Sequence, residues 1–249
     1  SSESFTAIKD DGTVGYWGWA SKNYIGSSGA PTSVGTNAKI SVNNGAFVAL
    51  KTDGTLLNWG TSSYGGSHSA KPTGTFSKVI ATRLGFVGLK TDGSIVEWGT
   101  NMSNNPPSGN NYADIFTIYD ENLLAVKSDG TLVAWGGTHP SIASLPTDND
   151  FLNAKFVTND RWNGSVTALK SNGTVVSWGG DSGATGFPTG NGYTNIFASS
   201  NTFLALNSNG SISQWGSPNT NNFQNATDIN FSGIWSYNKN DKEVGYYLN

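Results

Sequence analysis

Short apolar runs separated by small polar turns recur along the whole chain. In one copy, residues 47–51 and 56–59 have the pattern of two strands, and Thr52, Asp53, Gly54 and Thr55 lie between them. A Trp-Gly pair ends each copy, 37 to 43 residues after the last, at Trp17, Trp59, Trp98, Trp135, Trp178 and Trp215. Repetition at about 40 residues is typical of propellers and solenoids. The pattern therefore predicts an array of small β-units.

An Asp-Gly or Asn-Gly pair separates the two strands of every copy. The pairs are Asp11-Gly12, Asp53-Gly54, Asp92-Gly93, Asp129-Gly130, Asn172-Gly173 and Asn209-Gly210. Such pairs are a strong hairpin signal, and a two-residue type I′ turn is the expected geometry. That turn would place Leu50 opposite Leu57 and Val48 opposite Trp59. Both faces of the hairpin are largely apolar, so each hairpin is expected to lie between two neighbours, as in a propeller.

A third strand is predicted before each hairpin, and it would be the innermost strand, lining a central channel. The predicted ranges are 38–42, 77–81, 113–118, 154–157, 194–198 and 227–231. Residues 235–247 align with 5–17, although Lys242 replaces the turn glycine. We therefore expect an all-β fold in which residues 1–249 form a single closed β-propeller of seven blades. Its terminal repeats, 1–18 and 227–249, would meet at the closure seam, and six blades result if the tail hairpin instead completes the first blade.

The charge content argues against nucleic acid as a partner. Charged residues make up 12% of the chain, the net charge is −3, and the only arginines are Arg83 and Arg161. Nucleic-acid binding depends largely on clusters of Lys and Arg that neutralise phosphates. The recurring lysines, at Lys9, Lys51, Lys90, Lys127 and Lys170, are interpreted as solvated or snorkelling strand residues.

The chain has no cysteine, and no apolar run is long enough to predict a membrane span. With its low charge and polar loops, it is expected to be secreted or displayed at the cell surface. We expect a monomer, or one domain of a larger surface protein, without direct membrane insertion.

Catalytic and metal-binding patterns are not evident in the sequence. His68 and His139 lie in unrelated segments, and no Ser/His/Asp order or paired-histidine spacing accompanies them. The acidic stretches 120–121 and 148–150 lack the spacing of a twelve-residue calcium loop, so they are interpreted as turns. The repeated tryptophans are expected to pack between blades. We expect no enzymatic activity, no cofactor and no metal.

The motif Ala-Leu-Lys-x-Asp-Gly-Thr-Leu-x-x-Trp-Gly, seen at 49–60, resembles the repeat of the regulator of chromosome condensation family. The resemblance covers essentially the whole chain and implies a propeller, usually of seven blades. In the eukaryotic branch, which acts on a small GTPase and docks on chromatin, Gly-Gln-Leu-Gly usually follows the Trp-Gly pair. Here Gly60 is followed by Thr61 and Ser62, and no basic tail is present. The chain is more similar in style to the secreted branch, which includes the propeller-type β-lactamase inhibitory protein.

That resemblance implies a binding surface in the loops that join the innermost strand to the hairpin. The candidate ligand-binding residues in these loops are Asn44, Arg83, Tyr119, Asp120, Glu121, Asp160, Arg161, Trp162, Asn163 and Asn201. Both arginines belong to this set, and Arg, Tyr and Trp are enriched at binding hot spots. At three of the positions, Asn44, Arg83 and Asn201, the inhibitor usually has aromatic residues. The hypothesis is a non-catalytic, adhesin-like or lectin-like extracellular module that binds a glycan or protein. The alternative is a secreted inhibitor that caps an enzyme with the same loops.

Overall fold

The computed structural model describes residues 4–18, 30–67, 71–100, 102, 105–119, 122–137, 143–159, 164–180, 184–199, 202–216, 234–237 and 244–247. Over these residues the chain forms seven small antiparallel sheets, which follow one another in sequence order. Five sheets have three strands, and the first and last have two. A single turn of 3₁₀-helix, η2 (Ser62–Tyr64), follows the second sheet. None of the described helical segments is long and apolar enough to cross a membrane.

The strands of each sheet are adjacent in sequence. They are β1 (Ser4–Ile8) and β2 (Val14–Gly18); β3 (Lys39–Val42), β4 (Ala46–Leu50) and β5 (Leu56–Gly60); β6 (Phe76–Ala81), β7 (Gly85–Lys90) and β8 (Ile95–Gly99); β9 (Tyr112–Tyr119), β10 (Asn122–Lys127) and β11 (Leu132–Trp135); β12 (Lys155–Thr158), β13 (Ser165–Leu169) and β14 (Val175–Gly179); β15 (Tyr193–Ala198), β16 (Thr202–Asn207) and β17 (Ile212–Gly216); and β18 (Ile234–Tyr237) and β19 (Val244–Tyr247).

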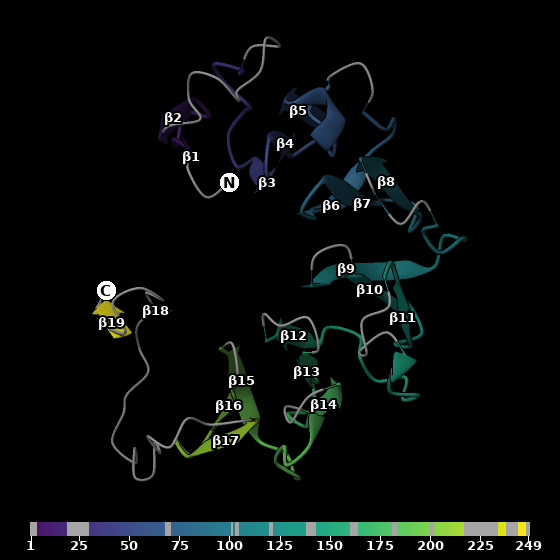
Figure 1. The fold of residues 1–249 in the computed structure, drawn as a ribbon, viewed down its shortest axis with the longest axis vertical. Coiled ribbons are helices and arrows are strands. Elements are labelled where there is room, and N and C mark those ends of the chain that lie inside the picture. Colours follow the sequence, from purple (N-terminus) through teal and green to yellow (C-terminus); the bar gives the residue numbers. More distant parts are fainter. Residues whose placement is uncertain are drawn as a thin grey trace.

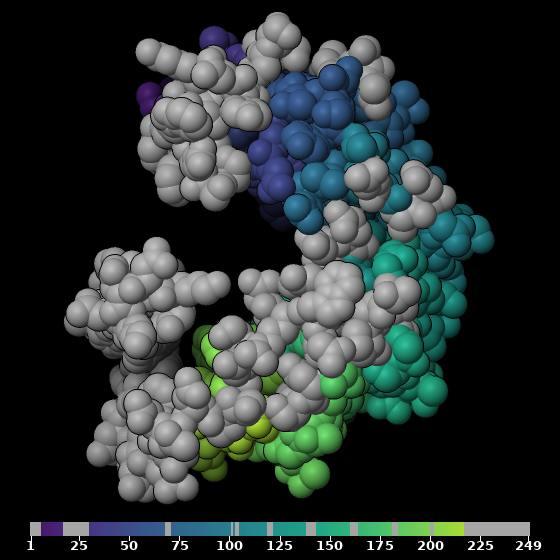
Figure 2. Space-filling model, viewed as in Figure 1, coloured from purple at the N-terminus to yellow at the C-terminus, as the bar shows by residue number. Residues whose placement is uncertain are grey.

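Figure 1 shows the sheets placed one after another around a central space. The leading strand of each three-stranded sheet, namely β3, β6, β9, β12 or β15, lies nearest that space, as predicted. The sixth predicted leading strand, 227–231, lies outside the described residues. The predicted tail hairpin is present as β18 and β19. In the space-filling view of Figure 2, the sheets from β3 to β17 form one continuous arc.

The hairpin turns differ from the prediction by one residue. The Lys51 amide donates to the Thr55 carbonyl at 3.0 Å, and the Gly54 amide donates to the Lys51 carbonyl at 3.0 Å. Gly54 has a φ of +80°, whereas Asp53 is not among the residues with positive φ. This is a three-residue loop that ends in a left-handed glycine, whereas a type I′ turn requires two such residues. The extra loop residue pairs Phe47 with Trp59, Ala49 with Leu57 and Leu50 with Leu56, so the predicted register is wrong.

The aspartate of each turn stabilises the loop with its side chain. Oδ1 of Asp53 accepts hydrogen bonds from the backbone N–H and the hydroxyl of Thr55, at 2.9 and 2.7 Å. These bonds favour the charged carboxylate and hold the pKa of Asp53 below its usual value. The pKa values of Asp11, Asp92 and Asp129 are lowered for the same reason. The aspartate that precedes each of these turn glycines therefore serves as a hydrogen-bond acceptor within the turn.

The corrected register stacks an aromatic pair in three of the described hairpins. The rings of Phe47 and Trp59 lie 5.4 Å apart and nearly parallel, and Phe86 with Trp98 and Phe203 with Trp215 repeat this contact. The repeat tryptophans then pack against the preceding sheet, as predicted. The members with described side chains, all buried, are Trp59, Trp98, Trp135, Trp178 and Trp215.

Polar bonds reinforce this packing between sheets. Trp135 Nε1 donates to Glu97 Oε1 of the preceding sheet at 2.6 Å. Trp215 Nε1 donates in the same way to Ser177 Oγ at 3.4 Å. In both pairs the acceptor residue immediately precedes a repeat tryptophan, and the donor is the repeat tryptophan of the following sheet.

A backbone hydrogen bond also links five of the described turns to the chain that leads into the next sheet. The Gly54 carbonyl accepts a bond from the Phe76 amide at 2.8 Å, and Phe76 is the first residue of β6. The same bond recurs from Val34 to Gly12, Tyr112 to Gly93, Phe151 to Gly130 and Tyr193 to Gly173. Because the turn glycine has a positive φ, its carbonyl is presented to the following segment. We call this contact the glycine link.

Candidate functional site

Two ends of the sheets must be distinguished. At one end the leading strand joins the hairpin, through loops such as 43–45 and 82–84; we call this end the loop face. The Asp-Gly and Asn-Gly turns lie at the opposite end, because a hairpin strand runs from one end of the sheet to the other. Of the candidate residues predicted from the sequence, Asn44 and Arg83 lie in these loops, and Tyr119 ends the leading strand β9.

The base of the first described loop is held by a buried asparagine. Asn43 is 5% exposed, and its Oδ1 accepts hydrogen bonds from the amides of Gly45 and Ala46, at 3.1 and 2.8 Å. Its Nδ2 donates to the carbonyl oxygens of Tyr64 and Gly85, at 2.8 and 3.2 Å. Gly85 belongs to the next sheet, so Asn43 fixes its own loop and ties it to the neighbouring loop.

Equivalent residues hold the other loops. Thr82 is buried, and its hydroxyl accepts a hydrogen bond from the Gly85 amide at 3.1 Å. Asn159 is also buried, and its Oδ1 accepts from the Ser165 amide at 2.6 Å. These side chains accept hydrogen bonds from loop backbone amides that have no backbone partner in a regular strand. The described loop bases are therefore held by side-chain hydrogen bonds, and Asn44 and Arg83 are exposed in the first two of these loops.

The structure brings together two of the predicted ligand-binding residues, Asn44 and Arg83. Both are exposed, and the Asn44 amide donates to the Arg83 carbonyl at 3.4 Å. They come from loops of adjacent sheets and are separated by one repeat in the sequence. The backbones of these two exposed residues thus lie next to one another on the loop face, and their side chains carry a guanidinium group and a carboxamide.

The other predicted residues are described only in part. Asp120, Glu121, Asp160, Arg161, Trp162, Asn163 and Asn201 lie outside the described residues, as do His68 and His139. For Tyr119 the structure describes the backbone, at the end of β9. Asn44 and Arg83 therefore define the described part of the site.

Sequence reasoning missed the support beneath Asn44. Gly45 lies against the ring of Tyr64, and a Cβ at this position would come within 2.5 Å of Tyr64 Cδ2. Tyr64 ends η2, which follows the hairpin of the same sheet. The available signal was the glycine itself, because a glycine beside an exposed loop residue often marks a close approach of another group.

The lysine of the fifth three-residue turn differs from the prediction. Lys170 is 5% exposed, and its ammonium lies 2.8 Å from Asp148 Oδ2 and 2.6 Å from Asp150 Oδ1. It also lies 4.6 Å from the centre of the Phe151 ring. Burial alone would lower the pKa of Lys170, but the hydrogen bonds to Asp148 and Asp150 raise it above its ordinary value. Residues 148–150 are thus an ion-pairing segment, and the prediction of a solvated lysine is wrong at this position.

Within the described ranges, no group of three or more His, Cys, Asp or Glu side chains is arranged to hold a metal ion. The clustered carboxylates that are described, Asp148 and Asp150, face the ammonium group of Lys170.

Comparison with known proteins supports the fold. No protein-family model and no curated protein sequence matches the chain. Among solved structures, it is similar to the ectodomain of the receptor kinase CR4 from Physcomitrella patens, with a TM-score of 0.55 and 16% identity over 86% of this chain. It spans 59% of that ectodomain, which is less than two thirds.

Two further solved structures are similar to the chain. The CRINKLY WD40 ectodomain of the Arabidopsis thaliana receptor kinase ACR4 has a TM-score of 0.50 and 16% identity, over 83% of this chain and 73% of its own. Yeast RCC1 (Prp20) has a TM-score of 0.47 and 15% identity, over 72% of this chain and 55% of its own. The latter score is too low to assign a family. WD40 repeats form propellers of four-stranded blades, so the all-β array described above has a β-propeller repeat fold.

Proposed function

We propose that this chain is a non-catalytic binding module that engages a protein or glycan through its loop face. The observation that carries the proposal is the pair formed by Asn44 and Arg83, which are exposed and adjacent on two tightly held loops. Loops fixed before binding lose little conformational entropy when a ligand docks. Arginine is also among the residues that contribute most to binding hot spots.

Repetition extends this surface around the ring. Each loop of the same type starts from the same end of a leading strand, so Tyr119, Asp120 and Glu121, residues 160–163 and Asn201 would share the face of Asn44 and Arg83. We propose that the complete site includes Arg161 and Trp162. A ligand contacting several loops would gain affinity from each without requiring a deep pocket.

We further propose that residues 1–249 close into a single seven-bladed propeller of the chromosome-condensation regulator type, in its secreted branch. The side chains of β1 and β2 support one part of this proposal, because Tyr16 packs against Phe47 and Trp59 of the next sheet. An extracellular, adhesin-like role is supported by the low charge and by the absence of cysteine. The structurally similar CR4 and ACR4 domains are themselves ectodomains.

The absence of catalysis is part of the proposal. The carboxylates whose pKa values are displaced, Asp11, Asp53, Asp92 and Asp129, accept hydrogen bonds within their own turns. Shifted pKa values often mark active sites, but the lowered pKa values of these aspartates are explained by hydrogen bonds within the turns.

The test is a glycan array run beside a pull-down from extracellular proteins, with Arg83→Ala, Asn44→Ala and Arg161→Ala as variants. Each variant should weaken binding while the melting temperature stays near that of the native chain. Lys155→Ala is the control for the arginine variants, because it also removes one positive charge but lies at the opposite end of its sheet. It should bind normally. Nanomolar affinity for one enzyme would favour the inhibitor alternative. Undiminished binding by all three loop variants would overturn the proposed site.

A further inference from the structure

Asn-Gly and Asp-Gly pairs are chemically reactive as well as turn-forming. The glycine nitrogen attacks the side-chain carbonyl carbon of the residue before it, because a residue without a Cβ leaves the approach open. Asparagine forms a cyclic succinimide with loss of ammonia, and aspartate forms the same ring with loss of water. The pairs within the described residues are Asp11-Gly12, Asn44-Gly45, Asp53-Gly54, Asp92-Gly93, Asp129-Gly130, Asn172-Gly173, Asn191-Gly192 and Asn209-Gly210.

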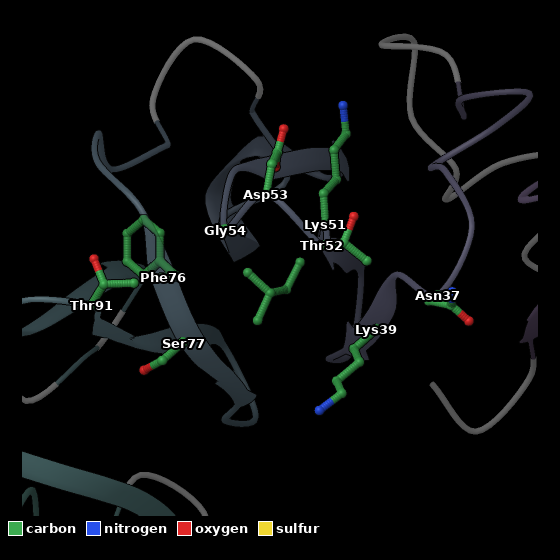
Figure 3. Close-up of a pocket in the computed structure, with 10 residues that line it drawn as sticks. Asn37, Lys39, Lys51, Thr52, Asp53, Gly54, Phe76, Ser77 and Thr91 are labelled. Carbon is green, nitrogen blue, oxygen red and sulfur yellow. The ribbon is translucent and has the colours of Figure 1, made fainter.

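In seven of these eight pairs the glycine amide already donates a hydrogen bond. Figure 3 shows the turn at Asp53 and Gly54, two of the residues that line a pocket beside the β6–β8 sheet. The Gly54 amide donates to the Lys51 carbonyl at 3.0 Å, and that of Gly45 donates to Asn43 Oδ1 at 3.1 Å. The bond of Gly54 recurs in the five other hairpin turns, at 2.8 to 3.0 Å, from Gly12, Gly93, Gly130, Gly173 and Gly210. Each of these amides must give up its bond before its nitrogen can lose a proton and attack.

The asparagine side chains of the hairpin turns are held as well. Oδ1 of Asn172 accepts hydrogen bonds from the backbone N–H and the hydroxyl of Thr174, at 3.0 and 2.7 Å. Oδ1 of Asn209 accepts one from the Ser211 amide at 2.9 Å. Attack requires the side chain to rotate until its carbonyl carbon faces the next backbone nitrogen, and these bonds restrict that rotation.

Asn191-Gly192 differs from the other seven pairs. Asn191 is exposed, and it precedes the leading strand β15, outside the hairpin turns. Within the ranges that the structure describes, neither the Asn191 carboxamide nor the Gly192 amide has a hydrogen-bond partner. The side chain is therefore free to rotate, and the glycine nitrogen has no bond to give up.

We propose that Asn191 is a site of spontaneous modification, at which water converts the asparagine to aspartate and isoaspartate. A bond forms between the Gly192 nitrogen and Asn191 Cγ, the bond from Cγ to Nδ2 breaks, and the amide proton leaves with the ammonia. Water then adds to one carbonyl of the ring and breaks its bond to the nitrogen, which regains a proton. Addition at Cγ gives aspartate, and addition at the backbone carbonyl gives isoaspartate. The reaction needs no oxidant, enzyme or cofactor.

The modified segment is bonded to the turn that joins β16 to β17. The Asn191 carbonyl accepts a hydrogen bond from Asn207 Nδ2 at 3.3 Å, and the Gly192 carbonyl accepts one from the Ser208 amide at 2.8 Å. Isoaspartate inserts a methylene group into the backbone between these two carbonyls, so it should displace the bonds. Either product also adds one negative charge to a chain whose net charge is −3.

The direct test is incubation of the native chain in mildly alkaline buffer, followed by peptide mapping with mass spectrometry. Asn191 should convert at least about fivefold faster than Asn44, Asn172 or Asn209, the ratio expected when one amide hydrogen bond must break first. In concentrated urea the four rates should become similar, because each asparagine precedes a glycine and the fold is gone. A rate at Asn191 that does not exceed the others in the native chain, or no conversion there while the unfolded chain reacts, would overturn the proposal.

Variants at the same position test the structural consequence. On incubation the native chain should lose melting temperature in proportion to its isoaspartate content. Asn191→Ser removes the reacting carboxamide and should keep its melting temperature. Asn191→Asp carries the charge on a normal backbone, so before incubation it should melt close to the native chain. An equal loss in Asn191→Ser would contradict the consequence, and the rate comparison in the native chain remains decisive if a variant folds poorly.

Discussion

The indole nitrogen of Trp135 donates a 2.6 Å hydrogen bond to Oε1 of Glu97, a residue of the preceding sheet. The two side chains are 38 positions apart, one repeat of the sequence, and Trp135 is 8% exposed. Two neighbouring sheets are thus joined by a side-chain hydrogen bond as well as by apolar packing.

Glu97→Ala should lower the free energy of unfolding by roughly 1–3 kcal/mol, because it leaves a buried N–H without an acceptor. Glu97→Gln retains an acceptor oxygen and should lose less. Trp135→Ala also removes the aromatic packing and should cost about 3–5 kcal/mol. Urea denaturation followed by circular dichroism measures all three. An equal loss in the Ala and Gln variants of Glu97 would show that the hydrogen bond contributes little.

The ion pairs of Lys170 predict an asymmetric response to substitution. Lys170 is 5% exposed, whereas the side chains of Asp148 and Asp150 are 56% and 47% exposed. The double variant Asp148→Asn, Asp150→Asn leaves a buried cation without a counter-charge and should cost roughly 1–3 kcal/mol. Lys170→Met leaves two carboxylates that water can solvate and should cost less. Chemical denaturation of both variants decides the point, and the opposite order would contradict the burial argument.

The turn aspartates predict a loss of stability in acid. Their folded pKa values are lowered, so the unfolded chain binds protons more readily as the pH falls. The stabilising contribution is complete above the unfolded pKa of about 3.9 and disappears as the pH falls through the folded pKa.

Between pH 7 and about pH 2.5, the melting temperature of a quadruple Asp→Asn variant at positions 11, 53, 92 and 129 should therefore fall less than that of the native chain. The chain contains its own control for this exchange. Asn172 makes the same two bonds to Thr174, at 3.0 and 2.7 Å, with a neutral acceptor. Identical acid sensitivity in variant and native chain would place the cause in other carboxylates.

Gly130 and Gly210 offer a matched pair for the turn geometry. Both have a φ of +84°, so alanine at either position pays the left-handed penalty of roughly 1–2 kcal/mol. A Cβ at Gly130 would also collide with the Asn149 backbone carbonyl, whereas nothing among the described residues lies within 4 Å of a Cβ at Gly210. Gly130→Ala should thus cost about 1–3 kcal/mol more than Gly210→Ala in thermal denaturation. Equal losses would mean that Asn149 moves aside freely.

The hairpins and leading strands were predictable because their signals are local. The Asp-Gly and Asn-Gly pairs mark the turns, and alternating apolar residues mark the strands on both sides of them. The register was not predictable from the same pairs, because Asp53-Gly54 suits loops of two or three residues. The bonds from Thr55 to Asp53 decide between them, and they shift every cross-strand partner by one.

The burial of Lys170 depends on aspartates about half a repeat away in the sequence. The contact of Asn44 with Arg83 joins residues one repeat apart. Nothing in the sequence next to Lys170 indicates that Asp148 and Asp150 neutralise it. Repeat position alone correctly placed Asn44 and Arg83 on neighbouring loops.

The glycine link joins consecutive sheets through main-chain atoms alone, as from the Phe76 amide to the Gly54 carbonyl. Side chains elsewhere in a repeat can therefore change without weakening this connection. A repeat that keeps its turn glycine could be duplicated, deleted or exchanged as a cassette and would still bond to whichever repeat follows. The array is in this sense a modular assembly, in which new loop sequences can be acquired by recombination of whole units.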